Sequence, residues 1–286
     1  MNTNYNMNQN YLKAEKEYLK GEKSLSVLSK EYSISRWSLT KYLKSKNIEI
    51  TRMNNKFKVD SNIFNTIDTE HKAYWLGFMY ADGYVWEKGI ELSLGIKDLN
   101  HLIKFKRFLK SEHKIGLNKT NFKGRYRCRI SIKDKTIVKD LIRLGCNNKK
   151  SLTLKFPTSD IVPDDLIRHF IRGYFDGDGS FYAGKASGKN YTLKSSVLGT
   201  KEFLTELDKV LNIAKPRKLY QDKRHRNNTY FIEWGSESNS KLVPYLYQNC
   251  SIFLDRKLRF IYDFCRFNEK FLKLLESNIG EPPSDT

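Results

Sequence analysis

The chain has 286 residues, with 52 Lys plus Arg against 32 Asp plus Glu, and therefore a formal net charge of +20 at pH 7. A protein with such a charge attracts polyanions. Hydrophobic residues make up 39% of the chain and aromatic residues 13%, which excludes a disordered basic tail. The length leaves room for one large domain or two to three small ones, at about 100 to 200 residues each.

The sequence has no window approaching 18 consecutive apolar residues, and its first ten residues are polar and rich in Asn. We therefore expect a protein that is neither secreted nor membrane-bound, and that lies in the cytoplasm in a bacterial, phage or viral setting, or wherever the host DNA is. The cysteines form no CxxC pair, so we expect reduced, mostly buried thiols at Cys128, Cys146, Cys250 and Cys265.

Residues 11–50 have the hydrophobic pattern of three short helices, and their middle part resembles a helix-turn-helix. Leu25, Leu28 and Tyr32 recur at helical spacing, and Ser35 is suited to cap the next helix. In a helix-turn-helix, the second helix enters the major groove with its N-terminal residues at the base edges. The alternative is a structural bundle with a solvated basic face. The predicted base readers are Arg36, Trp37, Thr40 and Lys41.

The strongest signal of the chain occurs twice, at Trp75–Gly83 and at Ile171–Gly179. Each copy is an apolar segment that ends in Asp-Gly, and the final aspartates are 96 residues apart (178 − 82). The similarity continues beyond the motifs, because Gly95–Asp98 is echoed by Gly199–Glu202. An internal duplication is the simplest explanation.

Small residues lie four apart in each copy, Gly77 with Ala81 and Gly173 with Gly177. Residues at this spacing share one face of a helix and allow another helix backbone to approach closely. We therefore expect the two motif helices to pack against each other.

The end of each predicted helix carries an acidic residue. We expect Gly83 and Gly179 to cap the helices in the left-handed conformation, which leaves Asp82 and Asp178 at the helix C-termini. The helix macrodipole repels a carboxylate there by about 0.3 to 1 kcal/mol. Two such ends side by side need a cation or a proton, and carboxylate oxygens in this arrangement suit Mg²⁺, which takes further ligands from water and phosphate.

Both copies resemble the LAGLIDADG motif, and the chain from about Asp68 to Asn268 resembles a single-chain LAGLIDADG homing endonuclease. The resemblance implies an α+β fold in which a duplicated αββαββα unit forms two saddle-shaped antiparallel sheets that grip DNA, beside the small all-α helix-turn-helix. The expected division is 1–50 for the helix-turn-helix, 51–69 for a linker, 70–160 and 161–276 for the two halves, and 277–286 for a flexible tail.

The resemblance also implies roles for residues around the motifs. It makes Asp82 and Asp178 the metal ligands and catalytic carboxylates, with Ala81 and Gly177 as the adjacent peptide positions. The metal is then Mg²⁺, with Mn²⁺ as the alternative ion. At the sixth motif position the second copy has Asp176 and the first has Tyr80. That position is expected to support the helix interface more than the metal.

Basic residues near the cleavage chemistry are expected from the same resemblance. We expect Lys150 and Lys257 near the scissile phosphate; the alternative is that they contact only backbone phosphate or solvent. For the residue that orders water in each half the candidates are Lys97 and Lys201, with Ile96 and Thr200 as the alternative aligned positions.

The segment 125–132 alternates in the manner of a strand. Its apolar side should carry Tyr126, Cys128, Ile130 and Ile132, and its other side Arg125, Arg127 and Arg129, which suit phosphates or guanine edges. The alternative is a solvated strand face. In the second half, basic residues that flank a predicted hairpin turn are expected to continue the surface: Arg217, Lys218, Lys223, Arg224 and Arg226.

The predicted function is a monomeric, site-specific endonuclease with internal pseudo-two-fold symmetry. It would make a metal-dependent double-strand cut in a long, imperfectly palindromic target in double-stranded DNA. The alternatives are a DNA-binding regulator that does not cut and an intron RNA maturase of the same fold.

Overall fold

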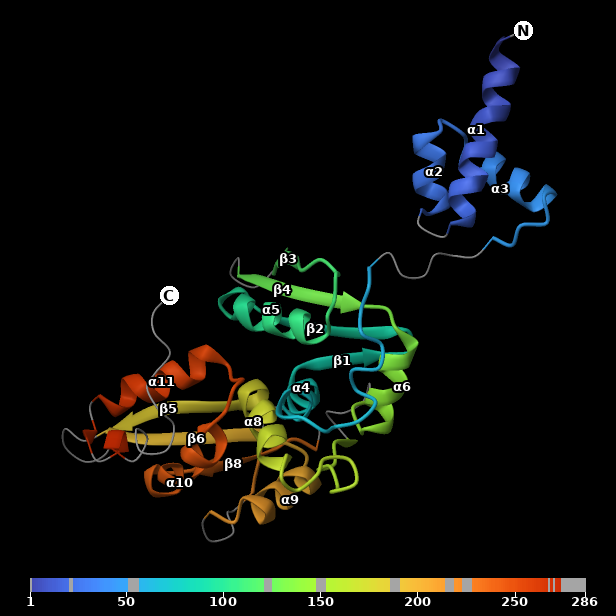
Figure 1. Ribbon diagram of the computed structural model, residues 1–286. Coiled ribbons are helices and arrows are strands. Elements are labelled where there is room, and N and C mark those ends of the chain that lie inside the picture. Colours follow the sequence, from blue (N-terminus) through green and yellow to red (C-terminus); the bar gives the residue numbers. More distant parts are fainter. Residues whose placement is uncertain are drawn as a thin grey trace. The chain divides into compact units, whose positions relative to one another are not determined.

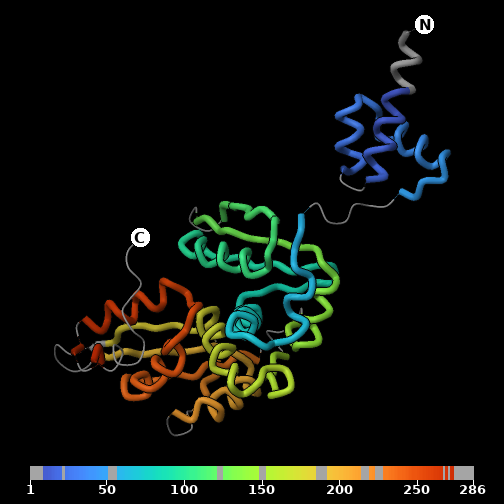
Figure 2. The backbone as a smooth tube through the Cα atoms, in the orientation of Figure 1, coloured from blue at the N-terminus to red at the C-terminus, as the bar shows by residue number. Residues whose placement is uncertain are grey.

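The computed structural model describes residues 2–20, 23–50, 57–120, 125–147, 153–185, 191–213, 219–222, 228–266, 268–269 and 271–273 (Figures 1 and 2). The chain divides into two compact units, residues 1–57 and residues 58–286. In the ranges that the structure describes, no helix has both the length and the apolar character needed to cross a bilayer.

The first unit consists of three helices, α1 (Asn2–Leu19), α2 (Leu25–Glu31) and α3 (Arg36–Ser45). Its core contains fully buried side chains from each of them, including Ala14, Leu28 and Leu39. The side chain of Ser35 accepts a hydrogen bond from Ser38 N at 3.0 Å and so caps α3 as the sequence predicts. The turn before it contains Ser33 with φ of +52°.

The second unit contains two halves with the same order of elements. The first half has α4 (Glu70–Ala81), β1 (Gly83–Trp86), β2 (Gly89–Gly95), η1 (Ile96–Asp98), α5 (Leu99–Phe108), β3 (Gly116–Lys119), β4 (Tyr126–Ile132) and α6 (Lys135–Arg143). The second half has α8 (Ile167–Asp178), β5 (Gly179–Lys185), β6 (Tyr191–Gly199), α9 (Lys201–Leu211), β7 (Tyr220–Gln221), β8 (Tyr230–Trp234), α10 (Ser236–Tyr247) and α11 (Asp255–Cys265).

Each half forms a four-stranded antiparallel sheet, in the order β1-β2-β4-β3 and β5-β6-β8-β7. The identical strand order confirms the predicted α+β fold and the internal duplication. Helices α4 and α8 lie side by side between the two sheets (Figure 1).

Strand β4 alternates largely as its sequence predicts. Cys128, Ile130 and Ile132 are buried, whereas Arg127 and Arg129 are exposed. The prediction is wrong for Tyr126, whose side chain is 51% exposed. Its partner in the sheet is Lys119 of β3, a strand that is exposed along its whole length, so no core lies beneath that corner.

The contact between α4 and α8 brings the two helix backbones together. A Cβ atom added to Gly77 would lie 2.0 Å from Phe170 O, and one added to Gly173 would lie 1.9 Å from Tyr74 O. One added to Gly177 would lie 2.2 Å from Ala81 Cβ. Equivalent motif positions therefore face each other, and the helices run in the same direction.

The left-handed caps predicted at Gly83 and Gly179 are wrong. Gly179 has φ of −80° and ψ of 162°, Gly83 begins β1, and among the described glycines only Gly145 has a positive φ. Both motif ends instead require glycine because the preceding helix turn leaves no room for a Cβ atom. A Cβ at Gly83 would lie 2.6 Å from Met79 O, because each strand leaves directly over the last turn of its helix.

The linker predicted over 51–69 extends too far. Residues 58–69 pack onto the first half, where Phe64 is fully buried and Ile67 nearly so. Asp60 N donates to Leu109 O at 3.0 Å. The few apolar residues of this polar segment bury their side chains in the core of the second unit, which makes it part of that unit.

The helix contact predicts the effect of one methyl group. Gly173→Ala should lower the free energy of unfolding of the second unit by about 3 kcal/mol, because the added Cβ can fit only if the helices separate. The measurement is a denaturant titration followed by circular dichroism. Gly116→Ala is the matched control, since its Cβ would meet no atom nearer than 3.8 Å. Equal stability of the two variants would contradict the proposed steric role of Gly173.

Candidate active site

The two motif aspartates lie at the same end of the helix pair. Asp82 is the C-terminal capping residue of α4, and Asp178 is the last residue of α8. A Cβ on Gly177 would lie 3.6 Å from Asp82 N, so the two helix ends are in contact. Asp82 is exposed and Asp178 is half-buried. The adjacent peptide positions predicted at Ala81 and Gly177 form that contact.

Lys257 of α11 lies against the C-terminal end of α8. Its side chain is buried, and Nζ donates hydrogen bonds to Phe175 O and Gly179 O, both at 2.5 Å. Phe175 O also accepts the capping hydrogen bond from Gly179 N, and the partial negative charge at a helix C-terminus favours a cation there.

The charges around Lys257 connect it to both motif aspartates. Burial lowers the pKa of Lys257 to about 8, and the nearby carboxylates of Asp176, Asp82 and Asp178 oppose this by favouring the charged amine. The structure therefore brings this predicted lysine within electrostatic reach of both aspartates.

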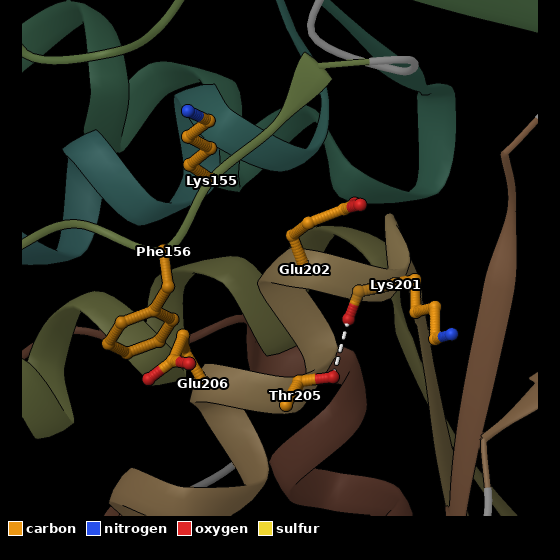
Figure 3. Close-up of a pocket in the computed structure, with 6 residues that line it drawn as sticks. All are labelled: Lys155, Phe156, Lys201, Glu202, Thr205 and Glu206. Carbon is orange, nitrogen blue, oxygen red and sulfur yellow. Dashed lines mark hydrogen bonds between the residues drawn. The ribbon is translucent and has the colours of Figure 1, made fainter.

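The lysines predicted to order water lie elsewhere. Lys97 is exposed in η1. Lys201 is exposed at the start of α9 and lines a pocket of about 460 Å³, which neither motif aspartate lines (Figure 3). The other residues that line the pocket are Lys155, Phe156, Glu202, Thr205 and Glu206.

The alternative position Thr200 is buried and serves as the N-cap of α9. Its Oγ1 accepts from Phe203 N at 3.2 Å and donates to Leu154 O at 2.5 Å. Its hydroxyl group therefore has a structural role. Ile96, the alternative to Lys97, is 41% exposed.

Several residues predicted from the sequence lie outside the described residues. They are Lys150 near the chemistry and, on the predicted hairpin, Arg217, Lys218, Lys223, Arg224 and Arg226.

Asp176 lies at the centre of a buried polar network behind the helix ends. Its carboxylate accepts hydrogen bonds from Tyr74 OH at 2.8 Å, Tyr247 OH at 2.7 Å and Leu254 N at 2.8 Å. Burial raises the pKa of Asp176, while the Lys257 charge and these donors oppose the shift. The first copy has Tyr80 at this position, and its hydroxyl donates to Leu144 O.

The network continues into the first half through Tyr74. Because the Tyr74 hydroxyl proton goes to Asp176, its oxygen accepts from His101 Nε2 at 3.0 Å, which assigns the proton of the neutral ring to Nε2. His101 Nδ1 has no hydrogen-bond partner among the described residues. Burial lowers the pKa of His101 to about 3, so the ring is neutral near pH 7.

A second buried polar cluster, centred on Arg172, was not predicted from the sequence. The fully buried guanidinium donates to Glu70 Oε1 at 2.6 Å, Ile252 O at 2.9 Å and Leu246 O at 3.0 Å. The signal was the presence of an arginine at a motif position where the first copy has Leu76. A charge on an apolar helix face requires buried partners.

The exposed face of the first sheet carries the predicted strand arginines. Arg127 donates to Ser93 O at 2.6 Å, and Arg129 lies 4.0 Å from a carboxylate oxygen of Glu91. Tyr84 and Trp86 of the edge strand β1 stack with ring centroids 5.9 Å apart. Arg125, the third predicted arginine, is exposed just before β4.

In the first unit, the predicted base readers lie along the surface of α3. Arg36, Trp37 and Lys41 are exposed, and Trp37 is 72% exposed. Lys41 Nζ lies 5.2 Å from the centroid of the Trp37 ring. Thr40 is half-buried and donates its hydroxyl proton to Arg36 O at 2.8 Å.

The comparisons with known proteins match the second motif copy and find similar solved structures. A family model for the LAGLIDADG-like domain matches residues 165–247, which include the second motif copy. No curated protein matches the chain.

Among solved structures, the chain is similar to the LAGLIDADG meganuclease I-AabMI bound to uncleaved DNA, with 13% identity, a TM-score of 0.46 and coverage of 73% of this chain and 94% of that chain. It is also similar to the I-LtrWI LAGLIDADG homing endonuclease bound to target DNA, with 15% identity, a TM-score of 0.47 and coverage of 77% and 99%. A third similar structure is the I-SmaMI LAGLIDADG homing endonuclease bound to cleaved DNA. It has 13% identity and a TM-score of 0.47, with coverage of 74% of this chain and 96% of that chain.

The neutral His101 predicts an acid-dependent loss of stability. Its pKa of about 3 in the folded chain lies below the value of about 6.5 in an unfolded chain, so between these values the unfolded state binds a proton that the folded state does not. As the pH falls below about 6.5, wild type should lose up to about 1.4 kcal/mol per pH unit relative to His101→Gln.

Denaturant titrations at a series of pH values measure this difference. Phe105→Leu is the control, because it alters the same core without removing a titratable group. A difference between wild type and His101→Gln that stays constant with pH would contradict a neutral, buried ring.

Proposed function

We propose that this protein is a site-specific endonuclease that makes a divalent-metal-dependent double-strand cut in a long, imperfectly palindromic DNA target. The observation that carries the proposal is the position of Asp82 and Asp178 at the adjoining ends of two equivalent helices. The duplication supplies one carboxylate for each strand of a duplex. Because both halves belong to one chain, the protein acts as a monomer with internal pseudo-two-fold symmetry.

The donor set fits Mg²⁺, with Mn²⁺ as the alternative ion. Carboxylate oxygens are hard ligands, and Mg²⁺ in phosphate chemistry uses only one or two of them, beside water and phosphate oxygens. Asp82 and Asp178 would hold the metal, which when bound supplies positive charge at the scissile phosphate and a more acidic water.

The residues of the chain itself supply binding and positioning. The Lys257 amine lies at the end of α8 and adds positive charge beside the carboxylates, where a phosphate is to be held. Arg127 and Arg129 extend from the exposed face of the first sheet, and contacts of this kind position a duplex and read guanine edges. Double-stranded DNA is the partner that a net charge of +20 favours.

We propose that the first unit is a helix-turn-helix that extends the DNA footprint. Its support is the exposed Arg36, Trp37 and Lys41 near the N-terminus of a capped helix. A separate compact unit can follow the duplex beyond the sequence that the sheets cover.

The endonuclease is tested by removing one carboxylate charge at a time. Asp82→Asn and Asp178→Asn should each reduce double-strand cleavage at least about a hundredfold, the loss seen when one group that stabilises a transition state is removed. DNA binding should remain. The measurement is cleavage of a duplex DNA library with Mg²⁺, then with Ca²⁺, and sequencing of the new ends.

Asp263→Asn is the matched control, because this aspartate is exposed on α11 and pairs only weakly with Arg266, at 3.8 Å. Full cleavage by both motif variants would refute the assignment. Enrichment of a site without cutting under either ion would instead support a regulator, and selective binding of intron RNA over duplex DNA would support a maturase.

The role of the first unit is tested by Arg36→Ala. If α3 reads DNA, the variant should bind the full target about 5- to 150-fold more weakly, which is the range for one specific base contact. Binding to a shortened duplex that covers only the central cleavage site should not change. Lys16→Ala removes the same charge from the exposed surface of α1 and serves as control. Equal affinities of the two variants for the full target would contradict base reading by α3.

A further inference from the structure

We propose that Asp98 and Arg256 are positioning residues that allow the first half of the protein to place Lys257 of the second half. The inference rests on the proposed endonuclease function, in which Lys257 lies beside the scissile phosphate. One cleavage centre then depends on a residue pair that joins the two halves.

The pair is bidentate and spans 158 residues of sequence. Arg256 Nε lies 3.0 Å from Asp98 Oδ1, and Arg256 Nη2 lies 3.2 Å from Asp98 Oδ2. Asp98 is 8% exposed. Two parallel charged hydrogen bonds fix orientation as well as distance. Because Arg256 directly precedes Lys257 in the first turn of α11, the pair also fixes the backbone position from which the Lys257 side chain extends.

The local structure around Asp98 shows that its carboxylate is directed to the other half. Asp98 occupies the N-cap position of α5, where an aspartate usually accepts a hydrogen bond from its own helix. Asp98 makes no such cap bond, and both of its oxygens accept from Arg256 instead.

The duplicated position in the second half lacks this contact. Glu202 corresponds to Asp98 in the repeated segments Gly95–Asp98 and Gly199–Glu202. It is exposed, lines the pocket of Figure 3 and accepts from Asn228 Nδ2 at 3.3 Å, within its own half. The duplication thus gives a cross-half carboxylate in one copy and a surface carboxylate in the other.

The segment before Lys257 is held by the first half at further points. Lys104 Nζ of α5 lies 2.6 Å from Asp255 Oδ1. Glu70 of α4 accepts from Ser251 N at 2.8 Å, and His71 Nε2 lies 3.0 Å from Ser251 Oγ. The segment that leads to Lys257 is therefore bound to the first half at Ser251, Asp255 and Arg256.

Lys257 needs such support because a lysine side chain is a flexible stem that carries a point charge. Its amine donates hydrogen bonds to Phe175 O in the last turn of α8 and to Gly179 O, the residue that follows Asp178. A small shift of the first turn of α11 would break both bonds. Both bonds hold the amine at the end of α8, so the cleavage centre beside Asp178 should slow more than the centre beside Asp82.

The test compares Asp98→Asn with Glu202→Gln in the full-length chain. On a supercoiled plasmid that carries the target, Asp98→Asn should slow the cut of one strand by about ten- to a hundredfold, the effect of losing one charge-assisted pair. The other strand should be slowed much less, so nicked plasmid accumulates. Glu202→Gln should cut both strands as wild type does. Equal slowing of both strands, or no slowing, would overturn the proposal.

Three further variants, Arg256→Met, its combination with Asp98→Asn, and Arg256→Lys, separate positioning from a general loss of folding. The double variant Asp98→Asn with Arg256→Met should be no slower than either single variant, because both remove the same pair. Additive losses would overturn the proposal. If Asp98→Asn does not fold, Arg256→Lys makes the same test, since it keeps the charge and loses the bidentate geometry.

A second readout does not require cleavage. Reductive methylation of the full chain with formaldehyde and a borane reductant, followed by mass spectrometry, measures the accessibility of each lysine. Lys257 should be modified at least about tenfold faster in Asp98→Asn than in Glu202→Gln, because its buried position depends on the pair. If wild type cuts no DNA, the endonuclease proposal fails while this measurement still tests the positioning. Equal modification rates in the two variants would overturn it.

Discussion

The contact between the backbones of α4 and α8 is the constraint on which the rest of the second unit depends. At Gly77 and Gly173 the neighbouring helix occupies the space of a Cβ atom, so the helices cannot rotate or slide past each other without a clash. Packed interiors tolerate such shifts poorly. With equivalent positions fixed face to face, both sheets must start from the same end of the helix pair. Asp82 and Asp178 share that end as a consequence of packing and of chain direction.

The buried polar groups around this contact distinguish the two halves. Arg172 carries a buried charge, and Asp176 is a buried group that can carry one. Burying an unpaired charge costs much free energy. Each is surrounded by partners from both halves, Glu70 for Arg172 and Tyr74 for Asp176. The first copy has Leu76 and Tyr80 at these positions. Swapping one half for a second copy of the other would leave these partners unpaired, so the polar clusters make the pairing of unlike halves specific.

The sequence predicted the features that arise from local periodicity, and it missed those that arise from tertiary contact. Small residues four apart indicated the helix contact, and alternation in β4 indicated its buried face. The glycine that ends each motif was recognised but misinterpreted, because sequence cannot distinguish a need for positive φ from a need for space beside Met79 O. The pair of Asp98 and Arg256 has no sequence signal, since nothing in either segment indicates a partner 158 residues away.

The charges at the helix ends explain why a lysine accompanies the two carboxylates. Asp82 and Asp178 lie where the macrodipoles of α4 and α8 already concentrate negative charge. Lys257 neutralises part of it by binding the carbonyls of Phe175 and Gly179. The amine is buried and cannot move far, so it offsets the dipole of α8 and leaves the carboxylates accessible. The negative potential that remains at the surface can attract a divalent cation, and the surrounding basic sheet can attract a polyanion. A site that holds both a divalent cation and a polyanion needs both signs of charge close together.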